Sequence, residues 1–156
     1  MGISRLVVAA TSSGNRKRGN CRMTLEGNVK ELARYWLSKS LEAEESATLL
    51  FDHQQWSACI SRLYYASFYA MSALLALRQL SYGKHSAVRA SLHRDFVKTG
   101  ALPVEVGMVY NRLFEWRQKA DYEAFLEMNE QMAEDLLTQA RDLLEVLRKH
   151  AEAEIG

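Results

Sequence analysis

The sequence predicts an all-α protein, an antiparallel up-and-down bundle of four to five helices. From Val29 onward, apolar residues recur at helical spacing, and no stretch alternates apolar and polar residues as a strand would. The single proline, Pro103, leaves long stretches free to be helical. Short connections between long amphipathic segments favour antiparallel neighbours.

The composition is that of one globular domain with an unusual N-terminal end. The chain has 156 residues, of which 48% are hydrophobic and 25% charged, as in ordinary globular proteins. Residues 1–22 carry five basic residues and no acidic one, whereas residues 23–156 carry 15 basic and 19 acidic residues. This mildly acidic remainder argues against a broad electrostatic surface for nucleic acid.

Residues 1–22 show no periodicity, so we expect them to be a disordered basic extension and residues 23–156 to form the bundle. Met23 is a candidate for the true start, in which case the preceding residues belong to a mis-called upstream reading frame. A solvated tail is the simpler interpretation of the basic residues, and RNA contact is the alternative.

The first two helices are expected over residues 29–51 and 54–80. The first has an apolar side and an outer face with three glutamates, Glu42, Glu44 and Glu45. The second is apolar nearly all round and should be the most buried. Its most apolar part, residues 63–77, is too short for a membrane span, and no membrane association is expected.

Three further helices complete the predicted bundle. The third, residues 86–98, begins where Ser86 can cap it and ends at Thr99-Gly100. The fourth, residues 103–120, opens at Pro103. The fifth, residues 128–152, carries one apolar stripe at helical spacing, formed by Met132, Leu136, Ala140, Leu143 and Leu147.

An arginine on an apolar face of the fourth helix is the most informative candidate site residue. Arg117 continues a helical stripe whose other members are Val106, Tyr110, Leu113 and Ala120, and Asp121 lies one turn further along. A desolvated guanidinium needs partners, so we expect Asp121 and a hydroxyl from residues 64–69 to hold it. Such an arginine either braces a core or an interface, or binds phosphate through two parallel hydrogen bonds. If the pair is buried, Asp121→Ala should destabilise the fold more than Glu44→Ala on the outer face.

A polar seam runs along the second helix at helical spacing, formed by Ser61, Tyr65, Tyr69 and Ser72. Buried tyrosine hydroxyls usually find a partner. The seam is therefore either a tyrosine ladder that bonds to neighbouring helices or the wall of a cleft that faces Arg117 and Asp121. In the second case its aromatic faces are available to a base.

The cysteines and histidines give no sign of a metal or cofactor site. Cys21 and Cys59 form neither a redox pair nor a metal motif, and the four histidines are scattered. Neither a glycine-rich phosphate loop nor a nucleophile motif is present. We therefore expect no metal or cofactor, and a cytoplasmic, reducing location is the default.

Four motifs, taken together and in this order, resemble the HEPN domain family. They are Arg62-Leu-Tyr-Tyr-Ala-Ser-Phe-Tyr-Ala70, Lys84-His85-Ser86-Ala-Val88, Phe96-Val97-Lys-Thr-Gly100 and Arg117-x3-Asp121-Tyr122. The resemblance covers about residues 29–150 and is closest to small stand-alone HEPN proteins that are often encoded beside minimal nucleotidyltransferases. It implies a helical bundle, a nucleotidyltransferase-type partner and a homodimer, which we expect to form through part of the second and fourth helices.

The resemblance also implies a ribonuclease motif that this chain matches only in part. Catalytic HEPN members are metal-independent endoribonucleases with an Arg-x4-6-His motif, in which the arginine steadies phosphate and the histidine transfers protons at the 2′-hydroxyl. Arg117 matches the arginine, but Tyr122, Glu123 and Ala124 fill the three histidine positions. A tyrosine with an ordinary pKa of about 10 is a poor base near neutrality. Arg78 and His85 match the spacing too, which we interpret as chance, with His85 organising the start of the third helix.

Three functions remain open from the sequence. The favoured one is a nucleotide- or RNA-phosphate-binding module that works with a minimal nucleotidyltransferase in a toxin–antitoxin-like system. The alternatives are a metal-independent endoribonuclease toxin with an altered motif and a ligand-free dimeric helical scaffold. The catalytic candidates are Arg117 and Tyr122, and the candidate ligand-binding residues are Arg62, Tyr65, Tyr69, Arg117, Asp121 and Tyr122.

Overall fold

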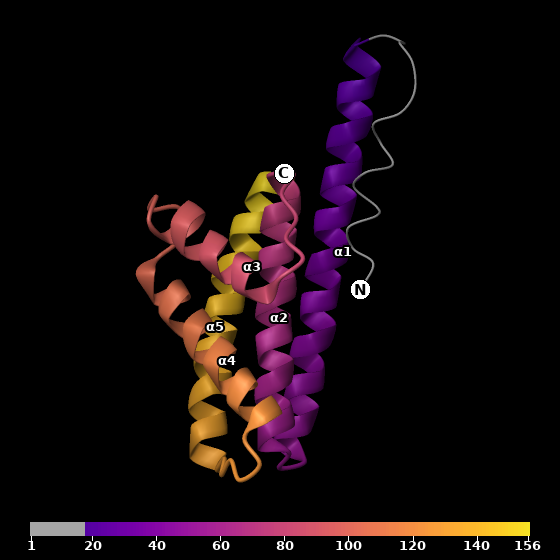
Figure 1. Cartoon of the computed structure of the whole chain (residues 1–156). Coiled ribbons are helices and arrows are strands. Elements are labelled where there is room, and N and C mark those ends of the chain that lie inside the picture. Colours follow the sequence, from indigo (N-terminus) through magenta and orange to yellow (C-terminus); the bar gives the residue numbers. More distant parts are fainter. Residues whose placement is uncertain (1–17) are drawn as a thin grey trace.

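The computed structural model describes residues 18–156, which form helices and no strand (Figure 1). The elements in chain order are α1 (Arg18–Asp52), α2 (Trp56–Leu77), α3 (His85–Ser91), the π-helical segment η3 (Leu92–Val97), α4 (Val104–Tyr122) and α5 (Glu130–Ile155). The predicted all-α bundle is confirmed. The first 17 residues of the expected N-terminal extension lie outside the described part of the chain.

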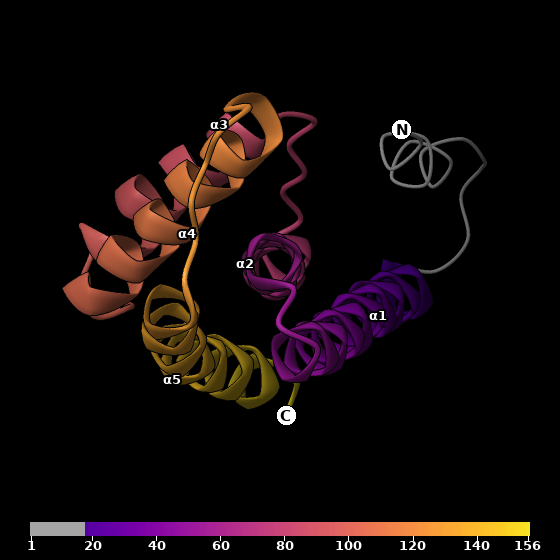
Figure 2. The same ribbon diagram turned by 90° about the horizontal axis from the view of Figure 1, so that it is seen from below.

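Helix α2 is the central element of the bundle. Viewed nearly along its axis, it is surrounded by α1, by α5 and by the pair α3 and α4 (Figure 2). This placement follows from its sequence, because a helix that is apolar nearly all round can bury every side only among neighbours. Its buried residues include Cys59, Ile60, Leu63, Tyr64, Ala66, Ala70, Met71 and Leu74.

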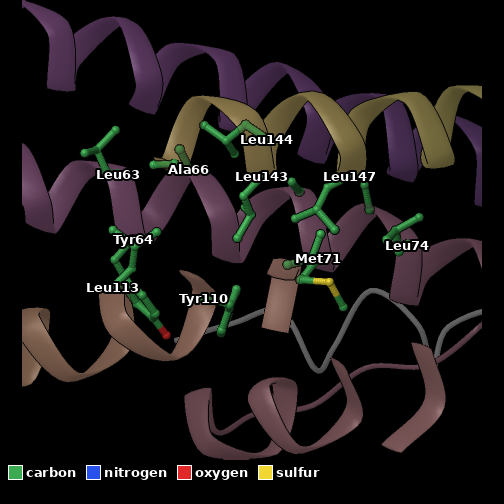
Figure 3. Close-up of a cluster of buried hydrophobic side chains, with 14 of the residues drawn as sticks. Leu63, Tyr64, Ala66, Met71, Leu74, Tyr110, Leu113, Leu143, Leu144 and Leu147 are labelled. Carbon is green, nitrogen blue, oxygen red and sulfur yellow. The ribbon is translucent and has the colours of Figure 1, made fainter. Parts of the chain in front are cut away.

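The core is packed where α2, α4 and α5 meet (Figure 3). Leu143 and Leu147 of α5 lie beside Met71 of α2, and Tyr110 of α4 approaches from the other side. Among the largest fully buried side chains of the described chain are two tyrosines, Tyr64 and Tyr110. A polar atom therefore enters the core at each of these rings and requires a partner.

Helix α1 begins earlier than the sequence predicted. It starts at Arg18, inside the expected extension, and not near residue 29. Its N-terminal turns rise beyond the rest of the bundle (Figure 1), and residues 25–28 are exposed. The prediction failed here because apolar periodicity marks only the part of a helix that packs against a core.

The π-helical segment η3 is held against α4 by a close approach at one glycine. A Cβ on Gly107 would come within 2.8 Å of His93 Cε1, so a side chain at position 107 would force the imidazole ring of His93 in η3 to move. The His93 Nε2 atom lies 2.9 Å from Asn111 Oδ1 of α4. The cap of α3 differs from expectation, since Lys84 is the N-cap residue and no side chain, Ser86 included, caps the helix.

A polar clamp joins α1, α2 and α5 on the other side of the bundle. Arg148 of α5 forms an ion pair with Glu44, and its Nη2 donates to Ser40 Oγ at 3.0 Å. The buried Ser40 hydroxyl donates in turn to the carbonyl of Ala66 at 2.8 Å. Glu44 was expected on the outer face of α1, and that expectation is wrong, because the residue faces α5.

No helix in the described part of the chain is both long enough and apolar enough to span a bilayer.

Candidate functional site

Arg117 lies where α4 passes α2 and the start of α3. Its side chain is 21% exposed, so the guanidinium is largely but not completely withdrawn from water. Helical periodicity brings it here: the same face of α4 buries Val106, Tyr110 and Leu113 earlier in the helix. The arginine is therefore the polar end of an otherwise apolar stripe, as the sequence predicted.

Two predicted partners hold this guanidinium. Arg117 Nε lies 3.1 Å from Asp121 Oδ2, one turn away on the same helix. Arg117 Nη2 donates to the Tyr65 hydroxyl at 3.2 Å. The Asp121 contact is an ion pair and not an aligned hydrogen bond, since the buried Nε–H has no acceptor within hydrogen-bond geometry among residues 18–156. The prediction that Asp121 and a tyrosine of α2 hold Arg117 is confirmed.

A histidine that the sequence did not place here completes the cluster. His85, the first residue of α3, lies with its Nδ1 atom 2.8 Å from the Tyr64 hydroxyl and 3.4 Å from Arg117 Nη1. Its ring stacks on Phe68 with the ring centroids 4.4 Å apart. Residues from α2, α3 and α4 thus converge on one point.

The surroundings determine which nitrogen of His85 carries the proton. Arginine can only donate, so the lone pair of Nδ1 must face Arg117 and accept from the Tyr64 hydroxyl. The proton of the neutral ring then lies on Nε2. Burial, and next the positive charge of Arg117, lower the pKa of His85 below its ordinary value. The ring is therefore neutral near pH 7.

Tyr64 is a donor and not a base in this arrangement. Burial raises the pKa of its hydroxyl to about 12, against the opposing effects of the nearby Tyr110 hydroxyl and of Arg117. Burial likewise raises the pKa of Tyr110 well above its ordinary value. The Tyr110 hydroxyl has no hydrogen-bond partner in the described part of the chain. Both tyrosines remain protonated over the range in which proteins function.

Comparison with known proteins agrees with this architecture. The family model described as "HEPN domain" matches residues 33–150, most of the chain. This chain belongs to the HEPN family. Its similarity to a Thermotoga maritima "UPF0332 protein" is 39% identity over 123 residues, which cover 78% of this chain and 93% of the relative.

Two further relatives carry a functional name. A Methanocaldococcus jannaschii protein named "Putative toxin MJ0142" is 36% identical over 112 residues, which cover 72% of this chain and 74% of the relative. A second protein of that organism, "Putative toxin MJ0605", is 26% identical over 125 residues, which cover 80% of this chain and 92% of the relative.

The structure brings together some, but not all, of the sequence candidates of this HEPN chain. Arg62 joins the cluster by lying over the Tyr65 ring, with 4.8 Å from its guanidinium carbon to the ring centroid. Tyr69 lies next to Tyr65, with 6.0 Å between the ring centroids, but it stacks on Trp36 of α1 at 5.7 Å and has no contact with Arg117 among the described residues. Tyr122 is 85% exposed and has no hydrogen bond or ring contact with the described residues. The candidates Tyr69 and Tyr122 therefore do not contact Arg117.

His85 is the site residue that sequence reasoning missed, and Tyr64 was included only as one of the hydroxyls of residues 64–69. Lys84-His85-Ser86 was visible as a motif, but its distance from Arg117 in the chain gave no sign of contact. The interpretation of the Arg78–His85 spacing as chance agrees with the geometry, because Arg78 lies over Phe96 at 3.9 Å and donates to the Asp95 carbonyl. The arginine that His85 contacts is Arg117.

The chemistry available at this site is anion binding with a neutral histidine beside it. Arg117 has five N–H groups, of which Nη1 and Nη2 direct one each to His85 and Tyr65. One N–H on each terminal nitrogen remains for a ligand. Among residues 18–156, no group of three or more His, Cys, Asp or Glu side chains is placed to hold a metal ion.

Proposed function

We propose that this chain is a toxin-like HEPN module that binds a phosphate of RNA or of a nucleotide at Arg117 and cleaves RNA weakly or not at all. The observation that carries the proposal is the way Arg117 is held. A tyrosine hydroxyl and a neutral imidazole from two other helices orient its guanidinium, while the only acid within ion-pair distance among the described residues is half-exposed.

The partners of Arg117 support a binding role over a bracing role. An arginine that braces a core is normally neutralised by a carboxylate in good geometry, because an unpaired buried charge is costly. Here Asp121 is 42% exposed and makes no aligned hydrogen bond with Arg117. Incoming phosphate can therefore compete for the guanidinium and offers it the bidentate geometry that Asp121 does not.

The names of the relatives and the family resemblance support the biological part of the proposal. Two relatives carry the word toxin in their names. The resemblance to HEPN proteins encoded beside minimal nucleotidyltransferases points to a partner of that type, in a toxin–antitoxin-like system. Co-purification of this chain with the product of a neighbouring nucleotidyltransferase gene tests the partner, and failure of the two to associate when expressed together would contradict it.

The test of the Arg117 site is a binding titration of labelled single-stranded RNA. We expect Arg117→Gln to weaken binding by about tenfold, the loss of one charge-assisted contact. Arg34→Gln, at an exposed arginine of α1, removes the same charge and serves as the control. Equal binding by Arg117→Gln and the control would refute phosphate binding at Arg117. Weak binding by wild type and variants alike would point to a ligand-free scaffold.

RNA cleavage is the second candidate, and His85 is the observation that favours it. No histidine follows Arg117 at the Arg-x4-6-His spacing, but the Nδ1 atom of His85 lies 3.4 Å from Arg117 Nη1, a distance that is compatible with the role of the motif histidine. Its Nδ1 lone pair is engaged by Tyr64 and Arg117, however, and Nε2 carries the proton, so the ring must change tautomer before it can act as a base. We therefore expect cleavage to be weak.

The cleavage assay uses labelled single-stranded RNA with a chelator present, which inhibits contaminating metal-dependent ribonucleases. Wild type, Arg117→Ala and His85→Asn are compared. Robust cleavage by the wild type that disappears in both variants would overturn the binding-module proposal in favour of the ribonuclease.

We further propose that the chain forms a homodimer through a surface that includes the outer face of α4. Val104 and Met108, one turn apart on this helix, are each 60% exposed. Paired exposed apolar side chains favour an interface. Light scattering should give a dimer mass for the wild type and a lower mass for Met108→Asp, and a wild-type monomer at tens of micromolar would exclude the dimer.

A further inference from the structure

Three arginines from three helices meet at one cluster of aromatic rings. The guanidinium carbon of Arg62 in α2 lies 4.8 Å from the Tyr65 ring centroid, and that of Arg89 in α3 lies 4.0 Å from the Phe114 centroid. Arg117 of α4 lies 5.2 Å from the Tyr64 centroid. Together with Tyr64, Tyr65 and Phe114, these arginines form what we call the arginine strip.

Tyr64 lies in the middle of the arginine strip. Its ring is 5.4 Å from that of Tyr65 and 5.8 Å from that of Phe114, measured between centroids. Arg62 and Arg89 therefore lie over different rings, with the ring of Tyr64 between those two. The positive charges of both Arg117 and Arg89 act on the Tyr64 hydroxyl, although burial has the larger effect on its pKa. Arg117 lies over both the Tyr64 and the Tyr65 rings, so it shares the Tyr65 ring with Arg62, whereas Arg89 lies over Phe114.

The arginine strip is short of negative charge. In the described part of the chain, Arg62 and Arg89 have no acidic group within 4 Å and no hydrogen-bond acceptor, and only Arg117 has an acid beside it. The other side of the bundle is different, since Arg141 and Arg148 both lie beside Glu44. Stacking on an aromatic face uses the plane of a guanidinium and leaves its N–H groups free at the edge.

We propose that the arginine strip binds successive phosphates of single-stranded RNA, with Arg62 and Arg89 as subsites on either side of Arg117. This inference rests on the proposed function of Arg117 and adds the class of ligand, an oligonucleotide and not a mononucleotide. A strand presents a phosphate at every nucleotide and can therefore engage arginines that lie over different rings, as Arg62 and Arg89 do, whereas a mononucleotide offers phosphate at one end only. Within residues 23–156, acidic residues exceed basic ones by 19 to 15, so the strip is a local concentration of positive charge in a mildly acidic bundle.

The experiment measures the affinity of labelled single-stranded RNA of about ten nucleotides as a function of salt concentration. Three neutralised phosphates predict a slope of log K against log salt of about −2 for wild type, since each phosphate on a single strand contributes about −0.7. We expect Arg89→Gln and Arg62→Gln each to make the slope shallower by about 0.7 and to weaken binding about fivefold. The control Arg34→Gln should leave the slope unchanged.

Competition with unlabelled ligands separates this inference from the proposed function. We expect a mononucleotide to compete much more weakly than the RNA. A mononucleotide that binds as tightly as the RNA and is lost in Arg117→Gln would overturn the arginine strip but leave the Arg117 site intact. An Arg117→Gln variant that binds RNA like wild type would overturn both. Single-stranded DNA of the same length that binds as tightly as RNA would refute the choice of RNA.

A structural role for the two flanking arginines makes a different prediction. If Arg89 and Arg62 only cover aromatic rings, then Arg89→Gln and Arg62→Gln lower the melting temperature and leave the salt slope unchanged. Melting curves for each variant therefore accompany the titrations, and an unchanged slope refutes the proposal whatever the melting temperature.

Discussion

Two arginines on opposite sides of the bundle, Arg148 and Arg117, show how similar burial serves different purposes. Their side chains are 15% and 21% exposed, and each has a buried Nε–H for which the described residues provide no hydrogen-bond acceptor. Arg148 is paired with a carboxylate from another helix, Glu44, and with a buried serine. Arg117 is held by neutral groups from other helices and by an acid of its own helix.

The difference lies in which charges are satisfied within the fold. The Arg148 clamp is closed: the guanidinium joins α5 to α1, and Ser40 of α1 donates a hydrogen bond to the Ala66 carbonyl of α2. The Arg117 cluster is open: its neutral partners orient the guanidinium without neutralising it. A closed pair contributes to stability, and an open one is available to an anion. Changes at Arg148 should therefore lower stability more than binding, and changes at Arg117 should lower binding more than stability.

The largest expected effect is the loss of the Arg148 clamp. Arg148→Ala should lower the free energy of unfolding by about 2–3 kcal/mol, because it leaves Glu44 without its partner in a partly buried site. Arg117→Ala should cost about 1 kcal/mol or less, since it removes a charge that the fold does not neutralise well. Chemical denaturation of both variants measures the difference. A larger loss for Arg117→Ala would show that Arg117 is a structural arginine.

The two carboxylates give a second, smaller contrast. Glu44→Ala should lower the free energy of unfolding by about 1–2 kcal/mol and Asp121→Ala by about 0.5 kcal/mol, because Asp121 is the more exposed. The sequence predicted the reverse order, with Glu44 as a harmless surface residue. Glu42→Ala, at an exposed position of the same helix, is the matched control for denaturation experiments. Equal effects of Glu44→Ala and Glu42→Ala would mean that the clamp contributes nothing.

The sequence predicted what depends on local spacing. Helical periodicity located every α-helix, and the nearly all-apolar second segment was correctly expected at the centre. The contact between Arg117 and Asp121 was also predictable, because residues four apart on a helix are neighbours.

Contacts between distant segments could not be predicted in this way. Glu44 sits among other glutamates in the sequence, and only the packing of α5, 104 residues later, turns it inward. His85 reaches Arg117 across 32 residues because η3, which directly continues α3, packs closely on α4 at Gly107. Periodicity gives the face of a helix but not which helix covers that face.

The smallest expected effect concerns the pH dependence of stability at the open cluster. Burial and the charge of Arg117 lower the pKa of His85 in the folded protein. As the pH falls, His85 therefore binds a proton in the unfolded chain at a higher pH than in the folded chain. The contribution of neutral His85 to the free energy of unfolding is fully present above its unfolded pKa of about 6.5. It is lost as the pH falls through the lower folded pKa.

His85→Gln should therefore flatten the dependence of the unfolding free energy on pH below about 6.5, relative to wild type. Arg117→Gln should raise the pKa of His85 toward its ordinary value, because it removes one of the two causes of the shift, and proton NMR of the His85 ring measures this directly. Arg148→Gln is the control and should leave the His85 titration unchanged. If the two arginine variants shift the His85 pKa equally, the charge of Arg117 does not act on this ring and the open cluster is not an electrostatic unit.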